Sequence, residues 1–255
     1  MRFSANLGFL FTDRPLPEAV RAAARAGFDA VECHFPYDTD PGALSAALED
    51  TGLPMLSLNT APGASFGLAA MPGQEAEARA AIDQAVAYAA EIGAANVHVM
   101  AGKTDGGPAA EETFRQNLAF ACTRAAAHGI GILIEPINHR DVPGYHLSRV
   151  EHAAAIIADL AQPNLRLMFD CYHTQIMQGD LTRRIEAHLP LIGHIQIAAV
   201  PDRGEPDAGE VNYPELLKSI AAMGYDRPIG AEYKPRGGDT AKGLGWLAPF
   251  QAIGA

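Results

Sequence analysis

The chain alternates, about eight times from end to end, between a short apolar run and a longer run with helical character. The expected strands are Phe3–Leu7, Ala30–Glu32, Met55–Leu58, Asn96–Met100, Gly131–Glu135, Leu165–Asp170, Ile192–Ile197 and Ile229–Glu232. The expected helices are Pro17–Ala26, Ala43–Glu49, Glu75–Ile92, Ala109–Ala127, Arg149–Leu160, Leu181–His188, Tyr213–Met223 and Asp239–Ile253. Strands buried on both faces form near-continuous apolar runs, and strands that alternate with helices pair in parallel. The alternation therefore predicts an α/β protein built on a parallel sheet.

The length of the chain narrows the choice among parallel folds. Eight β/α units within 255 residues are typical of a (β/α)8 TIM barrel, so we expect a single domain over residues 1–255. No linker, charge block or low-complexity segment divides the sequence. A doubly wound open sheet is the alternative. Its dinucleotide-binding form carries G-x-G-x-x-G after the first strand, and the sequence lacks that motif there.

Charge and cysteine content limit the partners of the protein. The net charge is −11, with 19 basic and 30 acidic residues, and this argues against nucleic acid or an anionic membrane because phosphates are bound mainly by Lys and Arg. The apolar runs are too short to span a bilayer, and the N-terminal segment lacks the pattern of a signal peptide. The three cysteines, Cys33, Cys122 and Cys171, are widely spaced and form no C-x-x-C pair, so we expect them to be reduced thiols. We expect a cytoplasmic protein with no nucleic-acid or membrane partner.

Polar residues stand within or at the end of the last four expected strands. Glu135, Asp170 and Glu232 each end an apolar run, and Gln196 lies in the seventh strand. The C-terminal strand ends of a TIM barrel carry the active site, so these side chains should meet at one side of the mouth. Three carboxylates repel one another in a small cavity unless a cation joins them, and oxygen ligands favour Mg²⁺ or Mn²⁺. The alternative is that each acid caps a helix or lies in a solvated loop.

An ordered set of short segments makes a resemblance specific. The segments are LIEPIN (Leu133–Asn138), RDVPGY (Arg140–Tyr145), FDCYHTQ (Phe169–Gln175), HIQIA (His194–Ala198) and AEYKP (Ala231–Pro235), with RFSANLGFLF at the start and LSLNT at Leu56–Thr60. Together they resemble the hydroxypyruvate isomerase family, which lies within the sugar isomerases and epimerases related to xylose isomerase. The similarity covers essentially the whole chain. It also implies a homo-oligomer.

The resemblance implies one divalent metal ion, Mg²⁺ or Mn²⁺, held by Glu135, Asp170, Gln196 and Glu232. Gln196 departs from the wider group, which more often has histidine at this position, and the harder amide ligand favours Mg²⁺ slightly. The implied reaction interconverts hydroxypyruvate and tartronate semialdehyde through a cis-enediol. In it the metal stabilises the enediolate, and Glu135 and Glu232 move the proton.

The resemblance also implies residues that contact the substrate. His173 lies three residues after Asp170, Asp141 lies six residues after Glu135, and Arg203 follows the seventh strand, where a guanidinium suits a substrate carboxylate. Each also has a structural reading, as a core histidine, a loop-shaping acid or a solvated arginine. Further candidates, at the barrel mouth or in the loop after the fourth strand, are Glu32, Asn59, His98 and Lys103. Histidines without a partner at a recognisable spacing are expected at the surface: His34, His128, His139 and His188.

Four other functions fit the same pattern to different degrees. A 2-oxo-tetronate isomerase would use the same metal and acid pair, and no residue reports the length of the pocket. A ketose 3-epimerase would use the same enediolate chemistry, but Gln196 and Arg203 weigh against it. A metal-dependent phosphodiesterase of the abasic-site endonuclease type needs about three zinc ions, more histidines and a basic DNA face. A non-catalytic barrel that binds a metabolite would have lost a catalytic acid, yet both are present.

Overall fold

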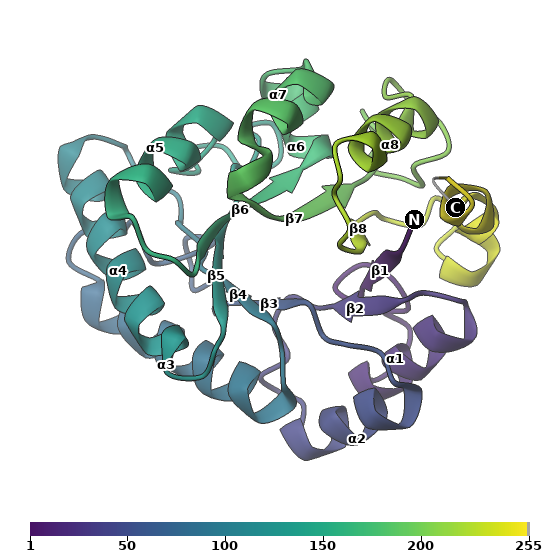
Figure 1. The fold of residues 1–255 in the computed structure, drawn as a ribbon. Helices are drawn as coiled ribbons and strands as arrows, with labels where there is room; N and C mark the ends of the chain where they lie inside the picture. Colours follow the sequence, from purple (N-terminus) through teal and green to yellow (C-terminus); the bar gives the residue numbers. More distant parts are fainter. Residues whose placement is uncertain (254–255) are drawn as a thin grey trace.

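The computed structural model describes residues 1–253, in which eight parallel strands form a ring inside a layer of helices (Figure 1). The strands are β1 (Phe3–Asn6), β2 (Ala30–Glu32), β3 (Ser57–Asn59), β4 (Asn96–His98), β5 (Gly131–Ile134), β6 (Leu165–Asp170), β7 (Ile192–Ile197) and β8 (Ile229–Ala231). Their order in the sheet is β2-β1-β8-β7-β6-β5-β4-β3. A parallel bridge between Val31 and Met55 joins β2 to β3 and completes the ring. The predicted (β/α)8 barrel is confirmed.

The helices follow the strands as the sequence predicts. They are α1 (Leu16–Arg25), α2 (Pro41–Thr51), α3 (Glu75–Ile92), α4 (Pro108–Ala126), α5 (Val150–Leu160), α6 (Cys171–Met177), α7 (Leu181–His188), α8 (Tyr213–Ala222) and α9 (Leu247–Gln251), with short 3₁₀ helices η1 (Leu189–Leu191) and η2 (Thr240–Trp246). Helix α2 begins where the Asp40 carboxylate accepts a hydrogen bond from the Ala43 amide at 2.8 Å. It ends at Gly52, whose φ of 68° is left-handed. Both signals are local, so the sequence alone predicts these ends.

Two helical segments differ from the prediction. Helix α6 was not expected, and it begins directly after β6 because the Asp170 carboxylate accepts a 2.7 Å hydrogen bond from the Tyr172 amide. The expected last helix, Asp239–Ile253, is instead the 3₁₀ helix η2 followed by α9. Gly243 and Gly245 lie in η2, and glycine lowers the stability of a regular α-helix.

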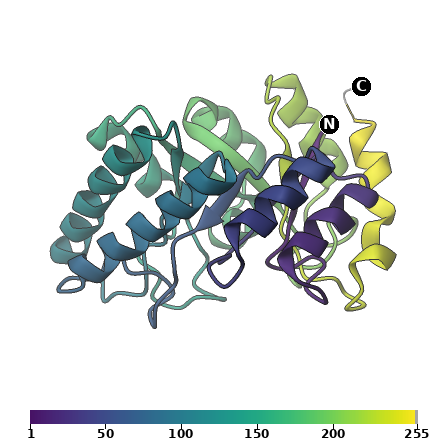
Figure 2. The ribbon, with the colours of Figure 1, turned by 90° about the horizontal axis from the view of Figure 1, so that it is seen from below.

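The core consists of the buried strands and the inward faces of the helices, and it brings the chain ends together. Helix α3 packs small residues such as Ala85 and Ala89, both fully buried, against the sheet. The N-terminus lies beside the end of α9 (Figure 2), and the Met1 amino group donates a 2.9 Å hydrogen bond to the carbonyl of Ile253. None of the helices within residues 1–253 combines the length and the apolar character needed to cross a membrane.

Candidate active site

The catalytic pair expected from the sequence faces one cavity at the C-terminal ends of the strands. The cavity has a volume of about 180 Å³ and contains both Glu135 and Glu232 in its wall. Its other lining residues are Phe9, His34, Phe35, Asn59, Phe66, His98, Met100, Ile137, Val142, His173 and Arg203. Pockets for drug-sized ligands have about 300–1,000 Å³, so this cavity fits a small metabolite.

Three buried oxygen atoms near this cavity have no hydrogen-bond partner among the described residues. They are Oε1 of Glu135, Oδ2 of Asp170 and Oε1 of Gln196. Asp170 and Gln196 are direct neighbours in the β6–β7 register, so their side chains leave the sheet at the same level. Buried polar atoms are almost always hydrogen-bonded, and oxygen atoms that lack a partner fit a hard divalent cation. The residues present therefore suit the metal that the resemblance implies.

Glu232 differs from these three residues because both of its oxygens are occupied. Arg203 Nη2 lies 2.6 Å from Oε2. Asn6 Nδ2 donates to Oε1 at 3.0 Å, and His34 Nε2 lies 2.8 Å from the same atom. The structure thus places the predicted fourth ligand in an ion pair, and its role as a ligand remains a proposal.

Arg203 is fixed in the site by its backbone and by two aromatic rings. Its amide donates to the Ala199 carbonyl at 2.9 Å, and its own carbonyl accepts from the Lys234 amide at 2.7 Å. The guanidinium carbon lies 5.0 Å from the ring centre of Phe9 and 4.9 Å from that of Tyr172. Cation–π contacts of this kind hold a planar guanidinium in one orientation. The same group approaches Asp170 to 3.5 Å, so one arginine serves two carboxylates.

The two glutamates have opposite pKa shifts. Burial, together with the nearby carboxylates Glu232 and Asp170, raises the pKa of Glu135 well above its usual value. Burial also raises the pKa of Asp170 to about 7, although Arg203 opposes the shift. For Glu232 burial acts in the same upward direction, but Arg203 and His34 outweigh it and lower the pKa. The shifts favour the protonated form of Glu135 and the ionised form of Glu232, an asymmetry typical of acid–base sites.

His173, predicted to contact substrate, points one ring nitrogen at the carboxylates. The backbone amide of Asn138 and its side-chain Nδ2 both donate to Nδ1 of His173, at 3.3 and 2.6 Å. Nε2 therefore carries the proton of the neutral ring and lies 3.7 Å from Glu135 and 3.5 Å from Asp170. Burial lowers the pKa of His173 well below its usual value, so the ring stays neutral. This tautomer presents a donor to the cavity.

His98 and Glu32 were both candidates for substrate contact, and the structure separates them. His98 lines the cavity, with Nδ1 3.7 Å from Glu135, and burial lowers its pKa to about 4. Glu32 is completely buried, is absent from the cavity wall and accepts hydrogen bonds from Ser4 at 3.3 Å and Ser57 at 3.4 Å. Glu32 is therefore not part of the cavity wall, and the substrate contact predicted for it remains a prediction.

The contacts of Glu32 explain how Gln196 presents its oxygen. Gln196 Nε2 donates to Glu32 Oε2 at 3.1 Å, and His194 Nε2 lies 2.9 Å from the same oxygen. With its amide nitrogen held there, Gln196 keeps Oε1 free of other partners. The packing requires glycine at position 230, because a Cβ there would lie 2.2 Å from Glu32 and 2.8 Å from Gln196. Glu32 is thus a positioning residue for Gln196.

Of the other predicted residues, Asn59 lines the cavity, and Asp141 and Lys103 do not. Asp141 is not in the cavity wall; it accepts hydrogen bonds from Tyr172 at 2.9 Å and Asn138 at 3.2 Å. Lys103 is exposed and also absent from the wall, and its backbone forms a bridge with Tyr145. Asn59 does line the cavity, at the end of β3 as expected. The substrate contacts predicted for Asp141 and Lys103 remain predictions.

His34 was expected at the surface, and this was wrong. It is half-buried, lines the cavity and binds Glu232, while His128 and His139 are exposed as predicted. The sequence did contain a signal for His34, because it lies two residues after the end of β2, at a C-terminal strand end like the other residues of the site. Sequence spacing concealed the contact because His34 and Glu232 are 198 residues apart.

The chain is thus a TIM barrel with two carboxylates in the wall of a small cavity at the C-terminal strand ends, the place where enzymes of this fold carry their active sites. Residues 20–250 match the family model described as xylose isomerase-like TIM barrel. A 2-oxo-tetronate isomerase from Cupriavidus necator is 46% identical over 98% of this chain and 98% of its own length. The hydroxypyruvate isomerase of Escherichia coli is 38% identical over 98% of this chain and 100% of its own.

A solved structure from Brucella melitensis, described as an AP endonuclease of family 2, superposes with a TM-score of 0.93. It is 42% identical and covers 97% of this chain and 98% of its own. The chain therefore belongs to the xylose isomerase-like TIM barrels and, within them, to the hydroxypyruvate isomerase family. It is an isomerase, and this excludes the alternative of a non-catalytic barrel that binds a metabolite.

Proposed function

We propose that the protein interconverts hydroxypyruvate and tartronate semialdehyde with one bound Mg²⁺ or Mn²⁺. The observation that carries this proposal is the pair Glu135 and Glu232 in the wall of one small cavity, with the pKa of Glu135 raised and that of Glu232 lowered. The unpartnered oxygens of Glu135, Asp170 and Gln196 would hold the cation, with Glu232 as a fourth ligand. Once bound, the cation would polarise the substrate carbonyl and stabilise the negative charge of an enediolate.

The reaction moves one proton between adjacent carbons, so it needs a base and an acid. Glu232 is ionised and would take the proton from C3 of hydroxypyruvate, leaving a C2–C3 enediolate. The hydroxyl proton on O3 would pass to O2, and Glu135 would return a proton to C2, which gives the aldehyde at C3. His173, whose Nε2 carries a proton, would donate to a substrate oxygen. Phe9, Met100 and Val142 line the same cavity and exclude water from the enediolate.

Arg203 is the proposed anchor for the substrate carboxylate. Its Nε is buried without a partner among the described residues, so one donor of the guanidinium remains free. We expect Arg203→Ala to raise KM for hydroxypyruvate by roughly 10- to 150-fold, the equivalent of about 1.5–3 kcal/mol for a hydrogen bond to a charged group. KM for an uncharged ketose should change much less. Steady-state kinetics with both substrates measures the difference.

Loss of Arg203 should also alter the pH profile. Arg203 lowers the pKa of Glu232, so in Arg203→Ala this pKa rises and the base form is lost at a higher pH. The acid limb of the kcat/KM profile would therefore shift upward. Arg183→Ala, at an exposed position on α7, is the matched control. Equal changes in KM for the acid and the ketose would count against Arg203 as the anchor.

Metal binding should depend on pH around neutrality. A carboxylate binds a cation most strongly after it has lost its proton, and the pKa of Asp170 is raised to about 7. Below that pH the folded apoprotein holds a proton at the site, so affinity for Mn²⁺ should fall as pH decreases from 8 to 6. The drop should approach about tenfold per pH unit for one proton released. Calorimetric titration at several pH values measures it, and a pH-independent affinity would contradict the assignment.

The substrate is tested directly. Purified protein is assayed with hydroxypyruvate, 2-oxo-tetronate and several ketoses, each with Mg²⁺ and with Mn²⁺. The proposal expects the highest kcat/KM with hydroxypyruvate. The second candidate is the four-carbon 2-oxo-tetronate, because the relative of that name is 46% identical against 38% for the Escherichia coli hydroxypyruvate isomerase. A preference for a ketose would favour a ketose 3-epimerase over both candidate activities. Phosphodiester hydrolysis of abasic DNA would overturn the isomerase proposal.

The predicted homo-oligomer is part of the same proposal, because the family resemblance alone implies it. Light scattering during size-exclusion chromatography measures the mass in solution. A mass near 26.9 kDa would indicate a monomer and contradict it.

A further inference from the structure

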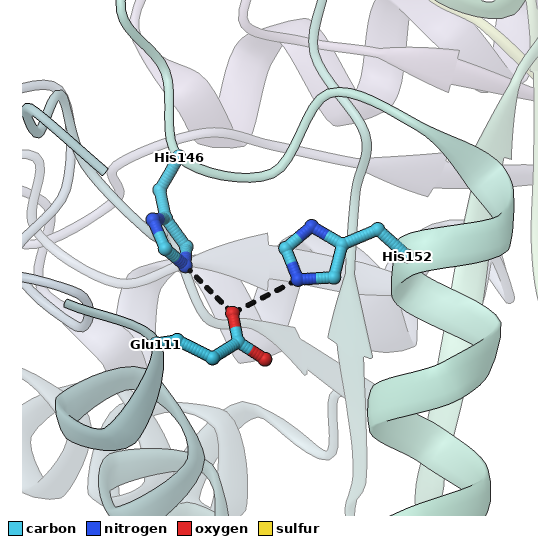
Figure 3. Close-up of side chains that lie close together, drawn as sticks. All are labelled: Glu111, His146 and His152. Atoms are coloured by element: carbon cyan, nitrogen blue, oxygen red, sulfur yellow. Dashed lines mark hydrogen bonds and ion pairs between the residues drawn. The ribbon is translucent and has the colours of Figure 1, made fainter. Parts of the chain in front are cut away.

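A second group of metal-ligating side chains lies outside the cavity. Glu111 comes from the first turn of α4, His146 from the loop between β5 and α5, and His152 from the first turn of α5. Figure 3 shows both imidazole rings directed at one oxygen of the carboxylate. Nε2 of His146 lies 3.0 Å from Glu111 Oε2, and Nε2 of His152 lies 2.9 Å from it. No residue of this group is part of the cavity wall.

The spacing of these three atoms is that of a metal site. Each residue offers one ligand atom, and the three atoms lie within 4.8 Å of one another. A tetrahedral zinc ion has bonds of about 2.0–2.2 Å to histidine nitrogen and carboxylate oxygen, which places neighbouring ligand atoms roughly 3.3 Å apart. The distances of 2.9 and 3.0 Å need only a small outward shift to admit the ion.

Neighbouring groups orient two of the three ligands. Thr104 Oγ1 lies 3.3 Å from His146 Nδ1, so the hydroxyl can accept the Nδ1 proton and leave the Nε2 lone pair toward Glu111. Arg115 donates to Glu111 Oε1 at 2.6 Å, so the carboxylate offers only Oε2. Asp159 lies 3.0 Å from Arg115 and offsets its charge.

We propose that Glu111, His146 and His152 bind a zinc ion, with water as the fourth ligand. Two imidazoles and one carboxylate favour Zn²⁺ over Mg²⁺, in contrast to the oxygen atoms of the strand-end site. The ion joins α4 to the loop between β5 and α5. That loop also carries Asn138, which orients His173, and Val142, which lines the cavity. The zinc site therefore stabilises one wall of the active site, and it does not depend on which substrate is turned over.

The test uses the untagged full-length protein, stripped with a chelator and titrated with Zn²⁺ by calorimetry. The background variant Asp170→Asn replaces a charged carboxylate of the strand-end site by a neutral amide, so the second site dominates the titration. In this background, His152→Ala should weaken Zn²⁺ binding by about 100-fold or more, because loss of an outer partner alone costs 10–100-fold. His128→Ala, at an exposed histidine outside the cluster, should leave it unchanged.

Two further measurements keep the proposal falsifiable. Glu111→Gln preserves the shape of the side chain and removes its charge, so it should lose the same affinity for Zn²⁺. It takes the place of His152→Ala if that variant proves unstable. Anomalous diffraction at the zinc edge should place a peak between the two histidines. Zinc affinity that is unchanged in both variants, or a peak only at the strand ends, would overturn the site.

Discussion

Replacing Glu232 by glutamine should lower kcat for isomerisation by about 10²–10⁴-fold, the contribution typical of a positioned acid or base. Glutamine keeps the size of the side chain and an oxygen that can accept from Asn6, but it cannot take a proton. Glu135→Gln should cause a loss of similar size, because it removes the acid that returns the proton. Initial rates with hydroxypyruvate at saturating Mn²⁺ measure both effects.

A matched control separates this chemistry from the loss of a buried carboxylate. Glu205 is 4% exposed, lies outside the cavity wall and contacts Arg236 at 3.4 Å, as Glu232 contacts an arginine. Glu205→Gln should therefore retain turnover. Circular dichroism and thermal melting verify that each variant folds. The double variant Glu135→Gln/Glu232→Gln should lose little more than either single one, because residues that act as a unit are not additive.

The proton-transfer proposal has a clear contrary outcome. Near-wild-type turnover in both single variants would show that neither glutamate moves the proton. Loss in Glu232→Gln alone would leave Glu232 as the only proton carrier, acting as both base and acid. The ionised state of Glu232 and the protonated state of Glu135 predict that both variants lose activity.

Removal of metal is the second prediction with a large effect. Treatment with EDTA should abolish isomerisation, and Mg²⁺ or Mn²⁺ should restore it. The physical reason is the set of buried oxygens on Glu135, Asp170 and Gln196 that have no hydrogen-bond partner among residues 1–253. Without a cation, nothing at these oxygens stabilises the enediolate charge. Elemental analysis before and after chelation, with activity at each step, measures the dependence.

The ligand assignment has its own control. Asp170→Asn removes a charge from the strand-end site and should prevent restoration of activity by either ion. Glu111→Gln alters the proposed zinc site alone, so the strand-end site should still bind Mn²⁺ in it. Full activity in a metal-free preparation would leave acid–base catalysis by the two glutamates as the mechanism.

The sequence by itself determined the barrel and the residues at its strand ends. Apolar runs, helix ends such as Gly52 and the acids that follow each strand are local features, because each depends on a few neighbouring residues. In a parallel barrel all C-terminal strand ends meet at one face, so local positions predict that Glu135 and Glu232 share a cavity.

Only the tertiary structure decided which charges these residues carry and which groups hold them. Arg203 pairs with Glu232 across 29 residues, and His34 does so across 198, through loops whose paths no local pattern encodes. Glu32 ends its strand like the other acids, yet it is completely buried, accepts a hydrogen bond from Gln196 and is not part of the cavity wall. Burial and distant charges set a pKa, and both depend on the complete fold. The division into an acid and a base therefore appears only when the barrel is assembled.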